Sequence, residues 1–154
     1  MKIEFCMKRN VVFIPLDTTI GEAALLMVKK HIGILPVVDG KDKPVGMVYM
    51  SDLLSLELPD FIDLIIDVDF VHDFGAVETT RPGQDQLSQP VSSIMQPVMT
   101  VEENDGLLRG YAHMVQNDLY DLPVTNDAGK LVGVVSRVDI GTAVLSMWPA
   151  GEIK

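Results

Sequence analysis

The chain has 154 residues, a formal net charge of −10 at pH 7 and one cysteine, Cys6. Nucleic-acid-binding proteins normally carry a basic patch, so the acidic balance argues against a nucleic-acid partner, although a few local cations suffice for a single nucleotide. The apolar runs are too short to span a bilayer, and one cysteine allows no intrachain disulfide. We therefore expect a cytoplasmic protein with no membrane partner, in which Cys6 is a small, partly buried residue.

The first half of the chain predicts five elements after a short helical lead-in over residues 1–10. In order, they are a strand over 11–14, a helix that starts at 17–19, strands over 34–38 and 45–49, and a helix over 52–58. Because proline has no amide to donate to a ladder, Pro36 predicts that the 34–38 strand is an edge strand or begins at that point.

Residues 59–90 belong to neither half. Apolar residues from Phe61 to Val71 follow helical spacing, and residues 75–89 are typical of a flexible connection. The end of the helical stretch overlaps an acidic cluster with one histidine: Asp67, Asp69, His72 and Asp73. Such side chains suit a divalent cation, but the spacing of a calcium loop and its glycine are absent, which favours a solvated acidic face. The helix over 61–71 is a second candidate contact for a dimer; otherwise the sequence leaves the role of this segment open, and it assigns no metal site to the chain.

The second half of the chain repeats the first with no gap. Identical residues recur 87 positions apart (133 − 46), among them the pairs Pro36/Pro123, Gly46/Gly133 and Asp52/Asp139. After a lead-in over 91–97, the matching elements are strands over 98–101, 122–125 and 131–135, and helices over 105–117 and 139–148. Each copy is short for an independent fold, so we expect two small domains that share a core.

The stretch from Gly133 to Asp139 joins a buried strand to a helix. Ser136 is suited to cap that helix, and the hydroxyl, the Asp139 carboxylate and the first helical amides gather at one point. A carboxylate accepts from a vicinal diol, while a hydroxyl and free amides donate to a phosphate, so the spacing suits a ribose phosphate. The alternative is a plain helix cap, since Gly, Ser and Asp are also ordinary turn residues.

These motifs resemble the cystathionine beta-synthase (CBS) domain in tandem, the arrangement called a Bateman module. The resemblance is carried by Leu35-Pro36-Val37 and Leu122-Pro123-Val124, and by the ending Gly-x-x-Ser/Thr-x-x-Asp, which the first copy changes by placing Tyr49 at the Ser/Thr position. It implies an α/β (α+β) fold of two pseudo-two-fold related domains, each strand-helix-strand-strand-helix. We expect a stand-alone module with a first domain over 1–58, an insertion over 59–90 and a second domain over 91–154.

The resemblance also implies a binding site for an adenosine compound: AMP, ADP, ATP or S-adenosylmethionine. The motif Asp would hold the ribose and the motif Ser or Thr would reach the phosphate. Transferred by position, the ligand-binding residues are Thr100, Tyr120, Asp121, Pro123, Ser136, Arg137 and Asp139. A second, weaker cleft comprises Phe13, Gly33, Ile34, Pro36, Tyr49 and Asp52. Tyr49 is expected to block that cleft; stacking on adenine is the alternative.

The sequence therefore predicts a regulatory module that senses an adenine nucleotide or S-adenosylmethionine and passes its state on through a dimer or an unknown protein partner. The alternative is a ligand-free interaction protein of the same fold. An enzyme is not expected, because no acid–base or nucleophile constellation is present, and no cofactor is required. Apolar residues on the closing helices predict a homodimer: Leu53, Leu54, Ile140, Val144, Leu145 and Trp148.

Overall fold

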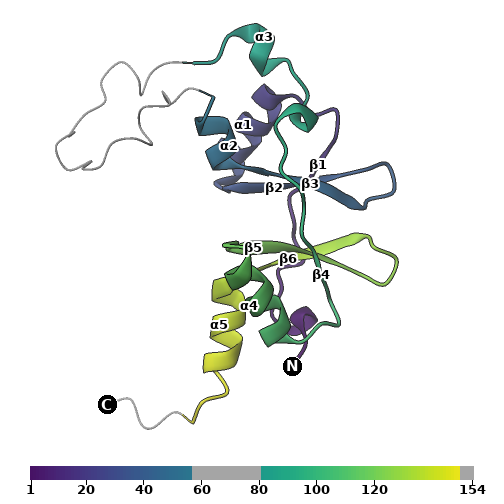
Figure 1. The fold of residues 1–154 in the computed structure, drawn as a ribbon, viewed down its shortest axis with the longest axis vertical. Helices are drawn as coiled ribbons and strands as arrows, with labels where there is room; N and C mark the ends of the chain where they lie inside the picture. The colour runs from purple at the N-terminus through teal and green to yellow at the C-terminus, as the bar shows by residue number, and fades with distance from the viewer. Residues whose placement is uncertain (57–80, 150–154) are drawn as a thin grey trace, which may run out of the picture. The chain divides into compact units, whose positions relative to one another are not determined.

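The computed structural model describes residues 1–56 and 81–149. They form two three-stranded sheets with helices, in the strand orders β1-β2-β3 and β4-β5-β6 (Figure 1). This mixed architecture confirms the predicted α/β class. The predicted helix over 61–71 and the acidic cluster from Asp67 to Asp73 lie outside the described residues. The pseudo-two-fold relation between the copies stays a prediction.

Each copy has the predicted order of strand, helix, strand, strand, helix. The first copy comprises β1 (Ile14–Pro15), α1 (Ile20–Lys30), β2 (Ile34–Val38), β3 (Pro44–Tyr49) and α2 (Met50–Leu54). The second comprises β4 (Val101–Glu102), α4 (Leu107–Gln116), β5 (Asp121–Thr125), β6 (Leu131–Ser136) and α5 (Arg137–Leu145). Helix α1 begins where predicted, because Thr19 and Glu22 form a reciprocal capping box.

The first strand of each copy is shorter than predicted and begins later. Strand β4 pairs with β5 only through Val101 and Glu102, so the predicted strand over 98–101 is wrong except at its last residue. Met99 instead packs against the hydrophobic core, without a ladder. The apolar run therefore indicated burial and not backbone pairing. The predicted strand over 11–14 is wrong in the same way, since β1 begins at Ile14.

The prediction that proline marks an edge strand is also wrong. Pro36 and Pro123 lie inside β2 and β5, which are the central strands of their sheets. In the second sheet the short β4 pairs only with Val124 and Thr125, so Pro123 lies beyond the end of the parallel ladder. The missing amide of Pro123 therefore breaks no bond on that side, and a central strand tolerates the proline.

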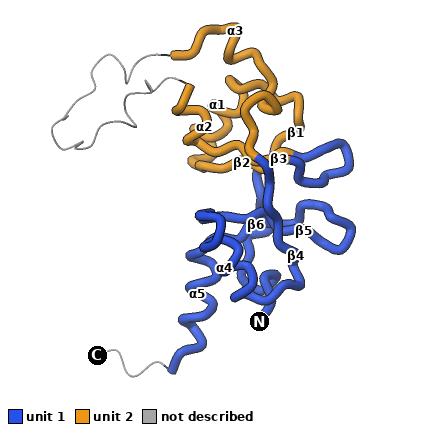
Figure 2. Tube along the Cα trace, in the orientation of Figure 1, with its two compact units in different colours: residues 1–13, 38–45, 97–154 blue, residues 14–37, 46–96 orange. Residues whose placement is uncertain are grey.

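The chain divides into two compact units that alternate along the sequence (Figure 2). Unit 1 contains residues 1–13, 38–45 and 97–154, and unit 2 contains residues 14–37 and 46–96. The predicted domain ranges follow the repeat along the chain, and this division cuts across them. The lead-in of the first copy, residues 1–10, belongs to unit 1, which holds most of the second copy. Most of the lead-in of the second copy, residues 91–96, belongs to unit 2, which holds most of the first copy.

The N-terminal lead-in completes the core of unit 1. Ile3 is fully buried, and its amide donates to the Asp105 carbonyl at 2.9 Å. A Cβ at Gly110 of α4 would lie 2.9 Å from the Ile3 side chain, so this glycine lets the lead-in approach the helix. The buried core that results comprises Ile3, Met7, Val101, Leu107, Met114, Leu122, Val124, Val135 and Ile140.

The second lead-in does the same for unit 2. Val91 is fully buried, and its amide donates to the Thr18 carbonyl at 2.8 Å. Before it stands the short helix α3 (Gln84–Leu87), and Gln89 accepts from the Ile20 amide. In its described part, residues 81–89, the predicted connection contains helix α3 and contacts α1; its flexibility stays a prediction.

Candidate functional site

The β6–α5 corner, residues 133–139, is built around a reciprocal capping box. The Ser136 hydroxyl accepts from the Asp139 amide at 3.0 Å, and the Ser136 amide donates to Asp139 Oδ2 at 2.9 Å. The predicted helix cap at Ser136 is confirmed. A carboxylate has about four acceptor sites and a hydroxyl can still donate its proton, so the cap leaves both groups able to bind a ligand.

The other oxygen of Asp139 faces a residue from the N-terminal lead-in. Lys8 forms an antiparallel bridge with Val134, with backbone bonds of 2.8 and 2.9 Å. Its ammonium Nζ lies 3.6 Å from Asp139 Oδ1; the Lys8 side chain is 67% exposed and that of Asp139 only 14%. The sequence reasoning missed Lys8, because this residue stands more than a hundred positions before the motif that it contacts.

Gly133 was the signal that could have pointed to this contact. A Cβ at Gly133 would lie 2.7 Å from the Lys8 carbonyl oxygen and 3.0 Å from the sulfur of Met7. A glycine inside a strand commonly marks the close approach of another backbone. The motif glycine therefore seats the lead-in, although its presence alone does not identify the segment that approaches.

Asp121 adds a second carboxylate to the corner. It lies opposite Ser136 in the β5–β6 register, and partial burial raises the pKa of its carboxyl. The charge of Asp139 raises that pKa further, while Lys8 lowers it. Burial, and the charge of Asp139, also raise the pKa of the Cys6 thiol, which keeps Cys6 in its protonated form. Lys8, Asp121 and Asp139 thus form one electrostatic cluster.

Arg137 points to a different group of partners. Its Nε donates to the Leu119 carbonyl at 2.7 Å, and its Nη2 donates to the Met114 carbonyl at 3.0 Å. The guanidinium also lies 4.2 Å from the ring centre of Tyr120 and 3.9 Å from the exposed Asp118 carboxylate. These contacts satisfy carbonyls at the C-terminal end of α4, where a cation is favourable. The arginine therefore joins α4 to α5.

The structure brings five of the seven predicted ligand-binding residues together at the corner. Asp121 is paired with Ser136, the Arg137 amide donates to the Tyr120 carbonyl at 2.9 Å, and Asp139 closes the cap. The other two lie elsewhere in unit 1: Thr100 is exposed just before β4, and Pro123 is buried in the middle of β5.

The β3–α2 corner of unit 2 repeats this construction with different side chains. Asp52 Oδ2 accepts from the Tyr49 amide at 2.8 Å, and Asp52 Oδ1 accepts from the Gln96 amide group at 3.0 Å. The Met50 amide donates to the Gly33 carbonyl at 2.8 Å. Ile34 and Pro36 lie in the adjacent strand β2, whereas Phe13 of the predicted weaker cleft belongs to unit 1.

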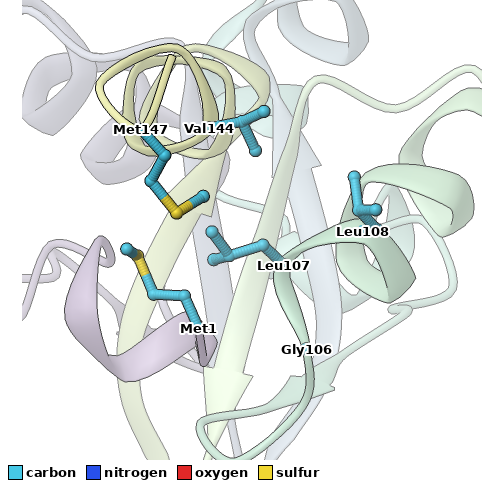
Figure 3. A pocket seen from close by; sticks show the side chains of 6 residues that line it. All are labelled: Met1, Gly106, Leu107, Leu108, Val144 and Met147. Carbon is cyan, nitrogen blue, oxygen red and sulfur yellow. The ribbon is translucent and has the colours of Figure 1, made fainter. Parts of the chain in front are cut away.

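A separate hollow of about 330 Å³ lies in unit 1, where the side chains of Met1, Leu107 and Met147 converge (Figure 3). Its full lining is Met1, Gly106, Leu107, Leu108, Val144 and Met147. The hollow adjoins the start of α4 and the end of α5, whereas Asp139 lies in the first turn of α5. Its apolar lining suits the packing of apolar side chains and not a nucleotide.

The helices predicted to mediate dimerisation do expose apolar side chains. Leu54, Leu145 and Trp148 are 52%, 54% and 65% exposed. Ile140 is only 1% exposed, so its assignment to the dimer face is wrong: it belongs to the core of unit 1.

Within residues 1–56 and 81–149, no cluster of three or more histidine, cysteine or acidic side chains is arranged to hold a metal ion. No helix in this part of the chain is long and apolar enough to cross a membrane.

Comparison with curated proteins gives relatives that are longer than this chain. An uncharacterized protein of Methanocaldococcus jannaschii, MJ1404, is 32% identical over 140 residues, which are 90% of this chain and 31% of that protein. The chloroplastic CBS domain-containing protein CBSX1 of Arabidopsis thaliana is 29% identical over 88% of this chain and 59% of its own length. The chain thus spans less than two thirds of these relatives.

Solved structures of paired CBS domains have the same fold. CBSX2, a chloroplastic Arabidopsis thaliana protein solved in complex with AMP, matches with a TM-score of 0.70 and 25% identity, over 95% of this chain and 97% of that one. The CBS domain pair of MJ0100, solved with 5′-methylthioadenosine and S-adenosyl-L-methionine, has a TM-score of 0.68 at 19% identity, over 96% and 98% of the two chains.

The family model of the CBS domain matches this chain twice, over residues 2–58 and 91–146. The two matches coincide with the two copies of the repeat, and both contain the Gly and Asp of the motif. The chain therefore belongs to the CBS domain family and carries two CBS domains in tandem.

Proposed function

We propose that the protein is a regulatory module that binds an adenosine ligand at the β6–α5 corner of its second copy. The observation that carries this proposal is the Asp139 carboxylate, which lies in a cluster with Lys8 and Asp121 beside the Ser136 hydroxyl. These groups supply acceptors for a diol and donors for an anion at one strand-to-helix junction. The AMP complex of the related CBSX2 supports the choice of ligand class.

In this proposal six of the seven predicted residues have a defined part, and Arg137 keeps its bonds to the Leu119 and Met114 carbonyls. Asp139 accepts from the two ribose hydroxyls, and Ser136 donates its hydroxyl proton towards the phosphate; no residue in the described part of the chain accepts that proton. Backbone groups at Tyr120 and Asp121, the buried Pro123 and the exposed Thr100 would contact the base. Asp139 keeps its bond to the Ser136 amide while it binds the ribose, because a carboxylate accepts several hydrogen bonds.

The second copy is the better of the two sites in chemical terms. Its corner offers Ser136 and the charge of Lys8, whereas the first copy has Tyr49 and the uncharged Gln96 in the corresponding places. We therefore propose one nucleotide per chain, with Tyr49 contributing bulk where Ser136 contributes a short hydroxyl. The proposed activity is binding and not catalysis, and no cofactor is part of it.

Regulation would follow from differential affinity. A ligand that binds one conformation of the module more tightly shifts the population towards it, and a partner reads that conformation. We propose a homodimer in the cytoplasm as the working form, with the exposed apolar side chains of the closing helices as its contact. Light scattering at high micromolar concentration tests this step: a dimer mass supports it, and a monomer mass contradicts it.

The exposed apolar side chains also favour a second candidate function, a ligand-free interaction protein of the same fold. Leu108, Val115 and Trp148 are 70%, 52% and 65% exposed on or just after the helices of the second copy. Singly placed apolar residues are ordinary on a protein surface, but several on neighbouring helices indicate an interaction site. In this alternative the corner is a helix cap alone.

A thermal-shift panel separates the two candidates. The protein is heated with AMP, ADP, ATP, S-adenosylmethionine and, as a control, GMP. A ligand at a hundred times its dissociation constant adds about 2.7 kcal/mol, which corresponds to a shift of about 5–10 °C for a chain of this length. Calorimetric titration then gives the stoichiometry. No shift with any adenosine compound would favour the ligand-free alternative, and two equivalent sites per chain would contradict the assignment to one copy.

A further inference from the structure

We propose that Lys8 is the specificity-determining residue of the adenosine site, and that its ammonium makes the site prefer a ligand with an anionic 5′ group over a neutral one. This inference rests on the proposed function of the β6–α5 corner. It assigns the phosphate contact to the N-terminal lead-in, a segment outside both the motif and the second copy.

The backbone of Lys8 is fixed while its side chain is free to turn. Bonds of 2.8 and 2.9 Å pin the residue to Val134 of β6, and the close approach at Gly133 leaves it no room to shift inwards. The side chain is 67% exposed, and its Nζ lies 3.6 Å from Asp139 Oδ1. A long, flexible lysine stem held at its base lets the ammonium follow a nearby anion.

The carboxylate that Lys8 faces is the one proposed to hold the ribose. Because a carboxylate oxygen has more than one acceptor site, Asp139 can accept from a ribose hydroxyl and stay beside the ammonium. The 5′ substituent of a nucleoside is attached to the same ribose ring. Because the diol and C5′ lie at different edges of the ring, the long, exposed stem of Lys8 has to extend from Asp139 towards the phosphate, where its ammonium would form a charge-assisted hydrogen bond.

Arg137 is less suited to this contact, although it is nearer in sequence to the motif. Two of its nitrogen atoms already donate to the carbonyls of Leu119 and Met114, at 2.7 and 3.0 Å. If the guanidinium moved to a phosphate, both carbonyls would lose their charged donor, and the Met114 carbonyl would keep, among the described residues, only the Leu119 amide, at 2.8 Å, which makes the move costly. Within the described part of the chain the Lys8 side chain holds no carbonyl: its one ion pair there is the 3.6 Å contact with Asp139, and the side chain is 67% exposed, so it can turn towards a phosphate without leaving a carbonyl unpaired.

The first copy supplies a natural comparison. Gln96 occupies the place of Lys8 and contacts Asp52 as Lys8 contacts Asp139, but it carries no charge. The variant Lys8→Gln therefore places a glutamine beside Asp139 in unit 1, just as the native Gln96 lies beside Asp52 in unit 2. The fold is expected to tolerate this side chain. The variant removes the charge, and its amide can still donate to Asp139.

The test measures the affinities of AMP and of 5′-methylthioadenosine by calorimetric titration. The two ligands share the adenine and the ribose and differ in the charge of the 5′ group. In Lys8→Gln we expect AMP to bind about tenfold or more weakly, with 5′-methylthioadenosine changed less than about twofold. The control Lys130→Gln makes the same charge change at an exposed lysine before β6, at the end away from Ser136, and should leave both affinities unchanged.

The outcomes distinguish this inference from the function on which it rests. If the unmodified protein binds neither ligand, both the adenosine site and the role of Lys8 are wrong. If it binds AMP and the ratio of the two affinities is the same in Lys8→Gln, the site stands and the role of Lys8 is wrong. Equal weakening in Lys8→Gln and Lys130→Gln would show a general charge effect and would also overturn the inference. A selective loss of AMP affinity in Lys8→Gln supports it.

Discussion

The two copies build the same backbone corner and equip it with different side chains. In both copies a glycine in the last strand lets the backbone of a lead-in approach closely. One oxygen of the motif Asp accepts from the backbone amide three residues earlier in the chain. The other oxygen of that Asp contacts a side chain of the lead-in. Three positions around the motif Asp differ. The residue that begins the closing helix cap is Ser136 in the second copy and Tyr49 in the first, and the residue on the neighbouring strand is Asp121 or Ile34. The lead-in residue beside the motif Asp is Lys8 in the second copy and Gln96 in the first.

This comparison separates the structural part of the motif from its chemical part. The Gly and the Asp are the same in both corners, and each has a structural task that requires no ligand. The residues that would recognise a ribose phosphate are the ones that differ. A matching Gly and Asp therefore identify the fold, and in our proposal the positions around them decide whether a copy binds a ligand.

The largest expected effect concerns the two motif glycines. A Cβ at Gly133 would meet the Lys8 backbone oxygen at 2.7 Å, whereas the closest atom at Gly46 is the sulfur of Met95, at the flexible end of a side chain, and the nearest backbone oxygen lies at 3.3 Å. We expect Gly133→Ala to lower the free energy of unfolding by about 2–3 kcal/mol and Gly46→Ala by about 1 kcal/mol. Urea denaturation of both variants measures the difference.

Gly141→Ala is a suitable control, because a Cβ at that position of α5 has no packing neighbour within 4 Å among the described residues beyond the backbone of its own helix. It should be neutral or slightly stabilising, since alanine is the better helix former. If Gly133→Ala and Gly46→Ala lower the free energy of unfolding by the same amount, the two lead-ins tolerate an added methyl group equally well. That result would contradict the difference that we infer.

The second prediction tests which corner binds the ligand. Asn at position 139 keeps an oxygen that can accept from the Ser136 amide, but it replaces the other carboxylate oxygen with a donor. Charge-assisted hydrogen bonds contribute about 1.5–3 kcal/mol, so Asp139→Asn should weaken AMP binding about tenfold or more. The matched change Asp52→Asn should leave AMP affinity within about twofold. Calorimetric titration of both variants decides the comparison, and the reverse pattern would assign the ligand to the first copy.

The sequence predicted the repeat, the order of elements and the capped corner, because periodicity, turn residues and the spacing of Ser136 and Asp139 are local signals. It failed on the prolines in β2 and β5, since whether a missing amide matters depends on how far a neighbouring strand extends. It also missed Lys8. The Lys8 contact exists because the N-terminal lead-in packs against the second copy. No local sequence pattern predicts which segment will approach a glycine in a strand.

The third prediction exchanges a residue between the corners. Met50 of the first copy corresponds to Arg137, so Arg137→Met removes the two bonds to the Leu119 and Met114 carbonyls and keeps an apolar stem. We expect a loss of about 1–2 kcal/mol in the free energy of unfolding, because these carbonyls lose their charged donor. AMP affinity should change less than about threefold. A large loss of AMP affinity with unchanged stability would make Arg137, and not Lys8, the phosphate contact.

The smallest expected effect is a pH dependence at Asp121, where the first copy has Ile34. Burial and the nearby Asp139 raise the pKa of the Asp121 carboxyl above its value in the unfolded chain. The folded state therefore holds this proton more tightly. The stabilisation that follows is present at low pH and is lost as the pH rises through the folded pKa. Asp121→Asn, which cannot ionise, should be slightly more stable than the unmodified protein at pH 7, and this advantage should shrink towards pH 3.5.

The size of the effect is a fraction of a kcal/mol, because Asp121 is only partly buried and Lys8 offsets part of the repulsion. Urea denaturation at pH 7 and at pH 3.5 measures it, with Asp17→Asn, an exposed position before α1, as the control for removing one negative charge. If Asp121→Asn is less stable than the unmodified protein at pH 7, the ionised Asp121 is a net stabilising partner of Lys8. The ammonium would then be held by two carboxylates in the unliganded protein, and a phosphate would have to displace both.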